Sequence, residues 1–230
     1  MNSKGICRES PTGQGRSLHL IALLVLVGVA LVASGVAPYD RLTWLMEVLP
    51  VLVALPLLGA TYRRFELTTL AYCLIAIHAL ILIYGGAHTY ARVPIGYVLQ
   101  DWLQLARNPY DRIGHFVQGF IPALLAREVL LRFQVVRRGG WLVFIVVSFC
   151  LALSAFYELI EFAAAMLLGQ GAEEFLGTQG DQWDTQWDMT LALGGACASL
   201  VLLSRWHDKQ LTALCGQADE ATRAGVAVRG

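Results

Sequence analysis

Residues 141–168 read WLVFIVVSFCLALSAFYELIEFAAAMLL, an apolar run that contains two charged residues, Glu158 and Glu161. A transmembrane helix needs about 20 predominantly apolar residues to cross a hydrocarbon layer of roughly 30 Å. The run is long enough for one crossing, and its apolar residues do not alternate with the period of two that is typical of a strand. Because a backbone in lipid must satisfy its own hydrogen bonds, the run predicts a transmembrane helix.

Five further apolar runs of the same character precede and follow this segment. They cover residues 18–36, 44–60, 67–86, 113–136 and 188–204. Hydrophobic residues make up 57% of the chain and charged residues 15%, against roughly 45–50% and about 25% in soluble domains. The sequence therefore predicts an all-α, polytopic membrane helix bundle of six transmembrane helices in contact with the lipid bilayer. The net charge of zero argues against a nucleic-acid partner.

Lysines and arginines fall unevenly on the two sides of such a bundle. If the N-terminus is cytoplasmic, twelve of the 17 lie in cytoplasmic segments and four in outer loops, and Arg127 lies within a span. Cytoplasmic segments of membrane proteins carry this excess, so we expect both ends of the chain in the cytoplasm. The expected organisation is a tail at 1–17, a six-helix transmembrane domain at 18–206 and a tail at 207–230.

The first run, 18–36, has an alternative interpretation as a cleaved signal peptide. Lys4, Arg8 and Arg16 precede it, and the tripeptide GVA at 35–37 is similar to a signal-peptidase site. At 19 residues, the run exceeds the 7–15 residues that are usual for the core of a signal peptide. We therefore expect a first helix that is retained.

Acidic and histidine side chains gather in the outer half of the predicted bundle. Counting depth along each span places these residues there: Glu47, His88, Asp111, His115, Glu158, Glu161, Asp181, Asp184 and Asp188. Pairs three or four residues apart, such as Asp111 with His115, share one face of a helix. An ionised side chain at the bilayer centre costs about 2.5–3.5 kcal/mol on insertion scales. We therefore expect the polar faces to turn toward one another inside the bundle.

Carboxylates combined with an imidazole are suitable ligands for a divalent metal ion. The candidate metal ligands are Asp111, His115, Glu158, Glu161, Asp184 and Asp188. A bound ion could polarise a phosphoryl or carbonyl oxygen of a lipid-linked substrate. His115, Glu158 and Glu161 are also the candidate catalytic residues, because buried carboxylates and imidazoles can transfer protons. No other cofactor is indicated.

Several of these residues also have a purely structural explanation. A carboxylate at a helix N-terminus accepts backbone N–H bonds, so Asp111 and Asp184 could each cap a helix. Glu47 could extend along the apolar surface toward the membrane interface. Arg127 and Glu128, at the inner end of their span, could form structural pairs.

Three motifs resemble the YjdF-like family of bacterial inner-membrane proteins: DRIGHF at 111–116, YELIEF at 157–162 and GDQWDTQWDM at 180–189. The resemblance covers about residues 20–205 and implies a multi-pass protein of the bacterial inner (plasma) membrane. Carried over by position, it marks Asp111, His115, Phe116, Glu158, Glu161, Asp184 and Asp188. It implies no particular reaction.

A looser resemblance links the chain to VanZ-like membrane proteins, which are associated with resistance to glycopeptide antibiotics. Where that family commonly has Lys, Gln and Asn, this chain has Arg112, Glu161 and Ala192. These departures argue against a VanZ-like activity.

Three functions are compatible with the sequence. The first is a site at the outer, periplasmic face that binds a metal or the polar headgroup of an envelope lipid-linked molecule. The second is a small proton-coupled transporter, because carboxylates within spans are typical of such proteins. The third is a structural membrane subunit, because the small residues at 194–199 favour close helix packing.

Overall fold

The computed structural model describes residues 14–168 and 173–227, and within these ranges every regular element is a helix. The elements, in chain order, are α1 (Gln14–Val36), α2 (Arg41–Thr61), α3 (Thr69–His88), the 3₁₀ helix η1 (Tyr90–Arg92), α4 (Pro94–Leu103), α5 (Tyr110–Arg132), α6 (Gly140–Leu168), α7 (Glu173–Leu176) and α8 (Asp184–Ala227). The predicted all-α class is confirmed.

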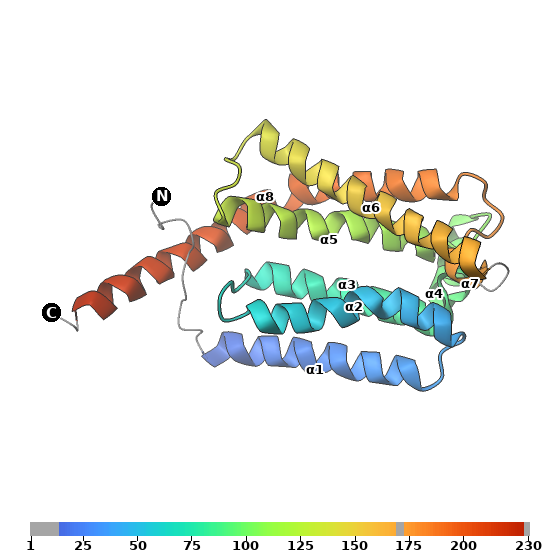
Figure 1. Ribbon diagram of the computed structural model, residues 1–230, viewed down its shortest axis with the longest axis horizontal. Helices are drawn as coiled ribbons and strands as arrows, with labels where there is room; N and C mark the ends of the chain where they lie inside the picture. Colours follow the sequence, from blue (N-terminus) through green and yellow to red (C-terminus); the bar gives the residue numbers. More distant parts are fainter. Residues whose placement is uncertain (1–13, 169–172, 228–230) are drawn as a thin grey trace.

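The long helices lie side by side in two groups (Figure 1). In one group α1 and α2 pack against α3, and in the other α5, α6 and α8 pack against one another. Contacts between α3 and α5 join the two groups. The short helices α4 and α7 lie at one end of the bundle, which we call the α7 end, whereas α8 extends beyond the bundle at the opposite end (Figure 1).

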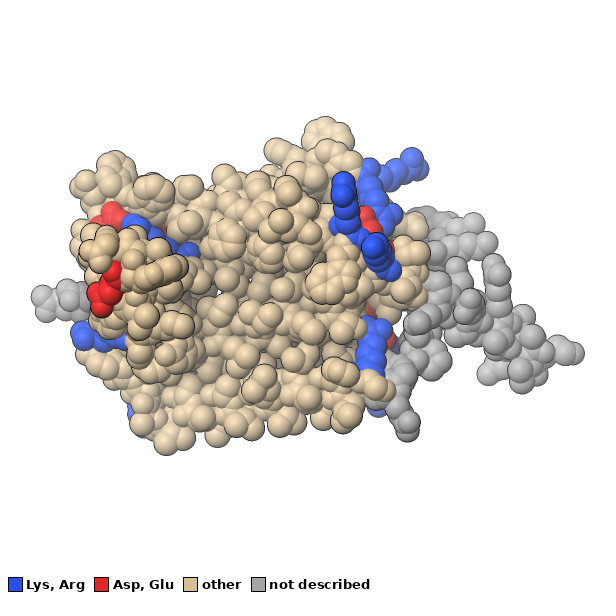
Figure 2. Space-filling view, turned by 180° about the vertical axis from the view of Figure 1, so that it is seen from behind, with Lys and Arg blue, Asp and Glu red and all other residues tan. Residues whose placement is uncertain are grey.

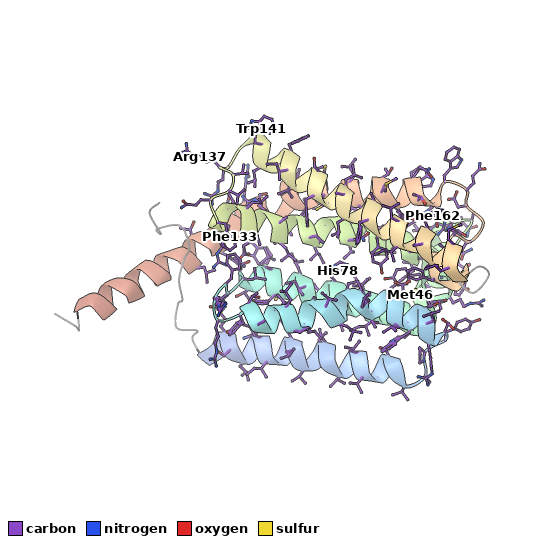
Figure 3. All side chains as sticks on the ribbon, in the orientation of Figure 1. Met46, His78, Phe133, Arg137, Trp141 and Phe162 are labelled. Carbon is purple, nitrogen blue, oxygen red and sulfur yellow. The ribbon has the colours of Figure 1, made fainter. Side chains whose placement is uncertain are left out.

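Five helices are long and apolar enough to cross a membrane, namely α1, α2, α3, α6 and α8. On the face seen in Figure 2, charged side chains gather at the two ends of the bundle, and a broad band without them lies between. Trp141 and Arg137 lie at the opposite end of the bundle, whereas Met46 and Phe162 lie at the α7 end (Figure 3). This distribution is that of a polytopic membrane protein, with an apolar belt between two polar ends.

The remaining expected span, α5, is long enough to cross but carries more charge than the others. Asp111, Arg127, Glu128 and Arg132 are all buried in it, because α3, α6 and α8 pack around this helix. The helix begins before residue 113, where it was expected to start, and ends before residue 136, where it was expected to end. At its start, the N–H of Tyr110, the first helical residue, donates a 3.0 Å bond to Asn108 Oδ1.

Helices α5 and α8 approach each other through glycines. A Cβ added at Gly119 of α5 would lie 1.8 Å from the backbone oxygen of Ala192, and one added at Gly195 of α8 would lie 2.0 Å from that of Phe116. Small residues allow two helix backbones to come this close within a membrane. The expected small face of α8 therefore exists, although Gly194 has open space beside it and does not belong to it.

Helix α8 continues well past the expected end at residue 204. Leu211 and Leu214 are buried, as is the fully enclosed His207. A drop in hydropathy marks where a helix leaves the hydrocarbon layer, and the backbone can remain helical beyond that point. The first residues of the expected tail at 207–230 therefore belong to the packed bundle.

The opposite end holds a buried network of charges around Glu128. Glu128 accepts bonds of 2.9 and 2.8 Å from the backbone N–H and hydroxyl of Thr68, and Arg132 pairs with it at 3.0 Å. His207 Nδ1 accepts from Arg127 Nη1 at 2.9 Å, so its proton lies on Nε2, which donates to Glu128 at 3.0 Å. Arg127 and Glu128, expected to form structural pairs, are therefore linked through a histidine that the sequence did not indicate.

Candidate functional site

Five polar side chains from three helices meet at the α7 end. Asp111 and His115 come from the first turns of α5, Glu158 and Glu161 from α6, and Asp188 from the start of α8. They converge because α5 packs against both α6 and α8. We call these five residues the His115 cluster; the expected convergence of the polar faces is observed.

The imidazole of His115 lies at the centre of this cluster. Its Nε2 is 3.6 Å from Asp111 Oδ1, 3.8 Å from Glu158 Oε1 and 3.9 Å from Asp188 Oδ2. These separations exceed the 2.7–3.2 Å of an N–H···O hydrogen bond. They are closer to the spacing of about 3.3 Å between two ligands of a tetrahedral zinc ion with bonds of about 2.0–2.1 Å. The nitrogen and the three carboxylates are close enough together that they could share a cation.

The cluster contains two sets of three possible metal ligands. Asp111, His115 and Asp188 form the first set, and His115, Glu158 and Glu161 form the second. In each set, one ligand atom per residue lies within 4.8 Å of the others. The donor set of one imidazole and four carboxylates suits Mn²⁺, Fe²⁺ or Zn²⁺.

Several buried atoms of the cluster lack a hydrogen-bond partner. They are His115 Nδ1, Glu158 Oε1 and Asp188 Oδ1, together with the neighbouring Ser154 Oγ and Tyr157 hydroxyl on α6. A buried polar group that stays unpaired costs about 1–3 kcal/mol, and native proteins rarely retain several in one place. These atoms are therefore available to an ion, a water molecule or a polar ligand.

Arg107, which the sequence analysis did not single out, binds the acids that flank the cluster. Its Nη1 pairs with Asp184 Oδ1, and its Nη2 lies 3.3 Å from Asp111 Oδ2. Asp184 therefore faces an arginine and belongs to neither ligand set. The other oxygen of Asp111 remains directed at His115, so Arg107 orients this carboxylate. Arg107 precedes Asp111 by four residues but lies in the loop before α5, so helical spacing did not indicate this contact.

The same arginine fastens the loop before α8 to the start of α5. Arg107 donates to the carbonyl oxygens of Gly177 and Thr178 at 2.9 and 3.0 Å. Gln179 exchanges two 3.0 Å bonds with the backbone N–H and C=O of Asn108. This loop carries Asp184 and Asp188 into α8, so these contacts position Asp188 against His115.

Asp181 lies outside α8, and Asp111 does not take the capping role considered for it. Asp181 precedes α8 and pairs at 2.6 Å with Arg112. Pro109 occupies the N-cap position of α5, and Asp111 lies within the first turn without acting as the cap.

Glu47 of α2 extends the polar region toward the first group of helices. Its side chain is only 2% exposed, so it does not reach toward the membrane interface. The Tyr90 hydroxyl of η1 donates to Glu47, whose Oε2 has no partner. Burial and, secondarily, the nearby Glu47 carboxylate hold the pKa of Tyr90 well above its usual range, so this hydroxyl stays a donor.

Together these features define a class: a polytopic α-helical membrane protein with a buried histidine–carboxylate cluster at one end. The family described as "Predicted membrane protein (DUF2238)" matches residues 19–209, and the chain belongs to this family. Over 181 residues it is 55% identical to the inner membrane protein YjdF of Escherichia coli (strain K12), covering 79% of this chain and 87% of that protein. No solved structure matches the chain. The family resemblance is confirmed, and the protein is a multi-pass protein of the bacterial inner membrane.

Proposed function

We propose that the His115 cluster binds a divalent metal ion and, through it, the polar headgroup of a lipid-linked molecule of the cell envelope. The observation that carries this proposal is the position of His115 Nε2, 3.6–3.9 Å from three carboxylates on three helices. Such carboxylates repel one another unless a cation or protons lie between them. A divalent ion would neutralise two of them and bind the imidazole in the same step.

The same proposal places the α7 end on the periplasmic side and counts α5 as the sixth span. The excess of Lys and Arg in the segments at the opposite end supports this orientation. The burial of α5 among α3, α6 and α8 explains how a helix with five charged residues crosses the membrane. In this orientation the cluster meets headgroups of the outer leaflet and not cytoplasmic metabolites.

Each residue has a role in the proposed chemistry. Asp111, His115 and Asp188 hold the ion, and Arg107 keeps Asp111 in place. A bound divalent ion polarises a phosphoryl or carbonyl oxygen. Glu158 and Glu161 lie beside that position and are the groups that would accept or donate a proton.

Metal content is the direct test. The detergent-purified protein is incubated with Mn²⁺, Fe²⁺ and Zn²⁺ at equal concentration, desalted, and analysed by inductively coupled plasma mass spectrometry. We expect a stoichiometric metal in the wild type and at most a tenth of that content in Asp188→Asn. Asp101→Asn is the matched control, because Asp101 is an exposed acid on α4 and its loss should leave the metal content unchanged.

The absence of stoichiometric metal from the wild type would refute metal binding. Equal metal in the wild type and in Asp188→Asn would refute the assignment of the site. Size-exclusion chromatography of each variant separates these outcomes from simple misfolding.

A proton-coupled carrier is the second candidate, and one observation favours it. Helices α5 and α8 carry buried titratable groups at both ends, with His115 and Asp188 at one and Glu128 and His207 at the other. In proteoliposomes a carrier would move protons across the membrane, and Glu158→Gln would abolish that flux. A metal-free protein with this flux would make the carrier the better assignment.

A further inference from the structure

Helix α4 is a short element between two long helices, α3 and α5, at the α7 end of the bundle (Figure 1). It begins with Pro94 and ends where Gln104 adopts the left-handed conformation, so it contains ten residues. Ten helical residues extend for about 15 Å, half of the roughly 30 Å that the hydrocarbon layer measures. The helix is therefore too short to be a further span, and its surroundings depend on the character of its faces.

One face of α4 is apolar and exposed. Ile95, Val98 and Trp102 follow the spacing i, i+3, i+7 and share this face, with exposed fractions of 53%, 64% and 76%. Tyr97 and Asp101, one turn apart, form a different, more polar stripe and are also exposed. A helix with an apolar face beside a polar one is typical of elements that lie in the plane of the membrane interface.

A third side of α4 is fixed to the start of α5. Gly96 is buried, and a Cβ added there would overlap Oδ1 of Asn108. Asn108 Nδ2 donates a 3.0 Å bond to the backbone oxygen of Val93, directly before α4, while its Oδ1 accepts from the Tyr110 N–H. One fully buried asparagine thus holds the beginning of α4 and the beginning of α5 together, and the apolar face of α4 points away from this contact.

Tryptophans of a second element mark the same end of the bundle. Trp183 directly precedes α8 and is 57% exposed, and Trp187 in the first turn of α8 is 49% exposed. Tryptophan is enriched where membranes meet water, because its ring is apolar and its N–H seeks a hydrogen-bond partner. Arg112 lies over the Trp187 ring, 5.6 Å from its centroid. These side chains and Trp102 of α4 together favour lipid, at the level of the headgroups, as the surroundings of this end.

We infer that α4 lies in the membrane interface at the α7 end, with Ile95, Val98 and Trp102 in the lipid and the Tyr97–Asp101 stripe toward water. This surface is additional to the proposed metal site and does not require a bound metal. Because Asn108 holds the start of α5 against α4, it also sets the depth of the His115 cluster. His115 follows Tyr110 by five residues, about 7.5 Å along the helix axis, so the cluster lies close below the headgroups.

Spin labels on α4 test this position. The full-length protein without native cysteines is reconstituted into vesicles of phosphatidylethanolamine and phosphatidylglycerol, and Ile95→Cys is labelled with a nitroxide. Power-saturation electron paramagnetic resonance then compares collisions with molecular oxygen, which is enriched in lipid, and with a nickel chelate, which stays in water. We expect oxygen collisions to exceed nickel collisions several-fold at Ile95→Cys. Asp101→Cys, on the same helix, is the matched control and should show the reverse ratio.

Two results would overturn the inference. Nickel collisions at Ile95→Cys as frequent as those at Asp101→Cys would place α4 in water. An immobilised label that neither reagent reaches would show that a partner protein or a second copy of the chain covers this face. If Ile95→Cys does not fold, Trp102→Cys gives the same comparison, because it lies on the same face. The measurement uses no metal ion, so it can fail while the proposed function stands, and the converse also holds.

Discussion

Glu128 and Glu158 show two ways in which a membrane protein buries a carboxylate. Glu128 accepts hydrogen bonds from Thr68, Arg132 and His207, so its charge is compensated within the protein. Glu158 has one buried oxygen without a partner, Oε1, which lies 3.8 Å from Nε2 of the His115 imidazole. The first arrangement stabilises the fold, whereas the second leaves binding capacity for a ligand. Both carboxylates are buried, so they differ in the pairing of their oxygens, and the unpaired oxygen of Glu158 is one basis for proposing a ligand there.

The network around Glu128 makes a prediction at the scale of one residue. His207→Leu removes a donor from Glu128 and an acceptor from Arg127, and each buried group left unpaired costs about 1–3 kcal/mol. We therefore expect a clear fall in the unfolding temperature of the protein in detergent. His19→Leu, on the exposed face of α1, is the control and should change stability by less than about 0.5 kcal/mol. An unfolding temperature equal to that of the wild type would contradict the network.

At the scale of the elements, the contact between α5 and α8 brings the ligands together. Both helices contribute residues to the His115 cluster at the α7 end and to the Glu128 network at the opposite end. The glycine contact lies between these two sites and fixes the position of one helix against the other. The contact also sets the separation of His115 on α5 from Asp188 on α8, which is 3.9 Å. A small displacement of either helix would therefore open the cluster.

A pair of glycine substitutions tests this contact. In Gly119→Ala the added methyl group would meet the backbone oxygen of Ala192, which cannot rotate away, and overpacking of this kind costs about 1–3 kcal/mol. Gly194→Ala adds the same methyl group to α8 in open space and should leave the stability equal or slightly raised. Unfolding temperatures of the two variants provide the measurement. Equal tolerance of both would show that the helices are farther apart than described.

At the scale of the whole molecule, the two polar ends have opposite character. The α7 end holds the unpaired acids, and the opposite end holds the compensated network and most of the lysines and arginines. Segments with this excess of positive charge remain in the cytoplasm during insertion. This asymmetry is the basis for the proposal that the site faces the periplasm.

Cysteine labelling measures this orientation. In a variant without native cysteines, Asp101→Cys on α4 and Lys209→Cys on α8 each place an exposed thiol at one end. A membrane-impermeant maleimide should label Asp101→Cys in intact spheroplasts and Lys209→Cys only after permeabilisation. The reverse pattern would place the cluster on the cytoplasmic side.

The candidate site was predictable in part because helical spacing is a local property. Asp111 with His115, and Glu158 with Glu161, could be assigned to common faces from their separations alone. Arg107 and His207 could not be assigned a role, because their partners lie far along the chain. Asp184 is 77 residues from Arg107, and Glu128 is 79 residues from His207.

The sequence by itself determined that the protein is helical and lies in the membrane, because the length and apolarity of each run decide whether a segment can cross. The tertiary structure alone decided which acids have a basic partner. It turned Asp184 toward Arg107 and left Glu158 and Asp188 facing His115. Apolar burial depends on composition along one segment, whereas compensation of a charge depends on atoms of several helices within about 4 Å of one another.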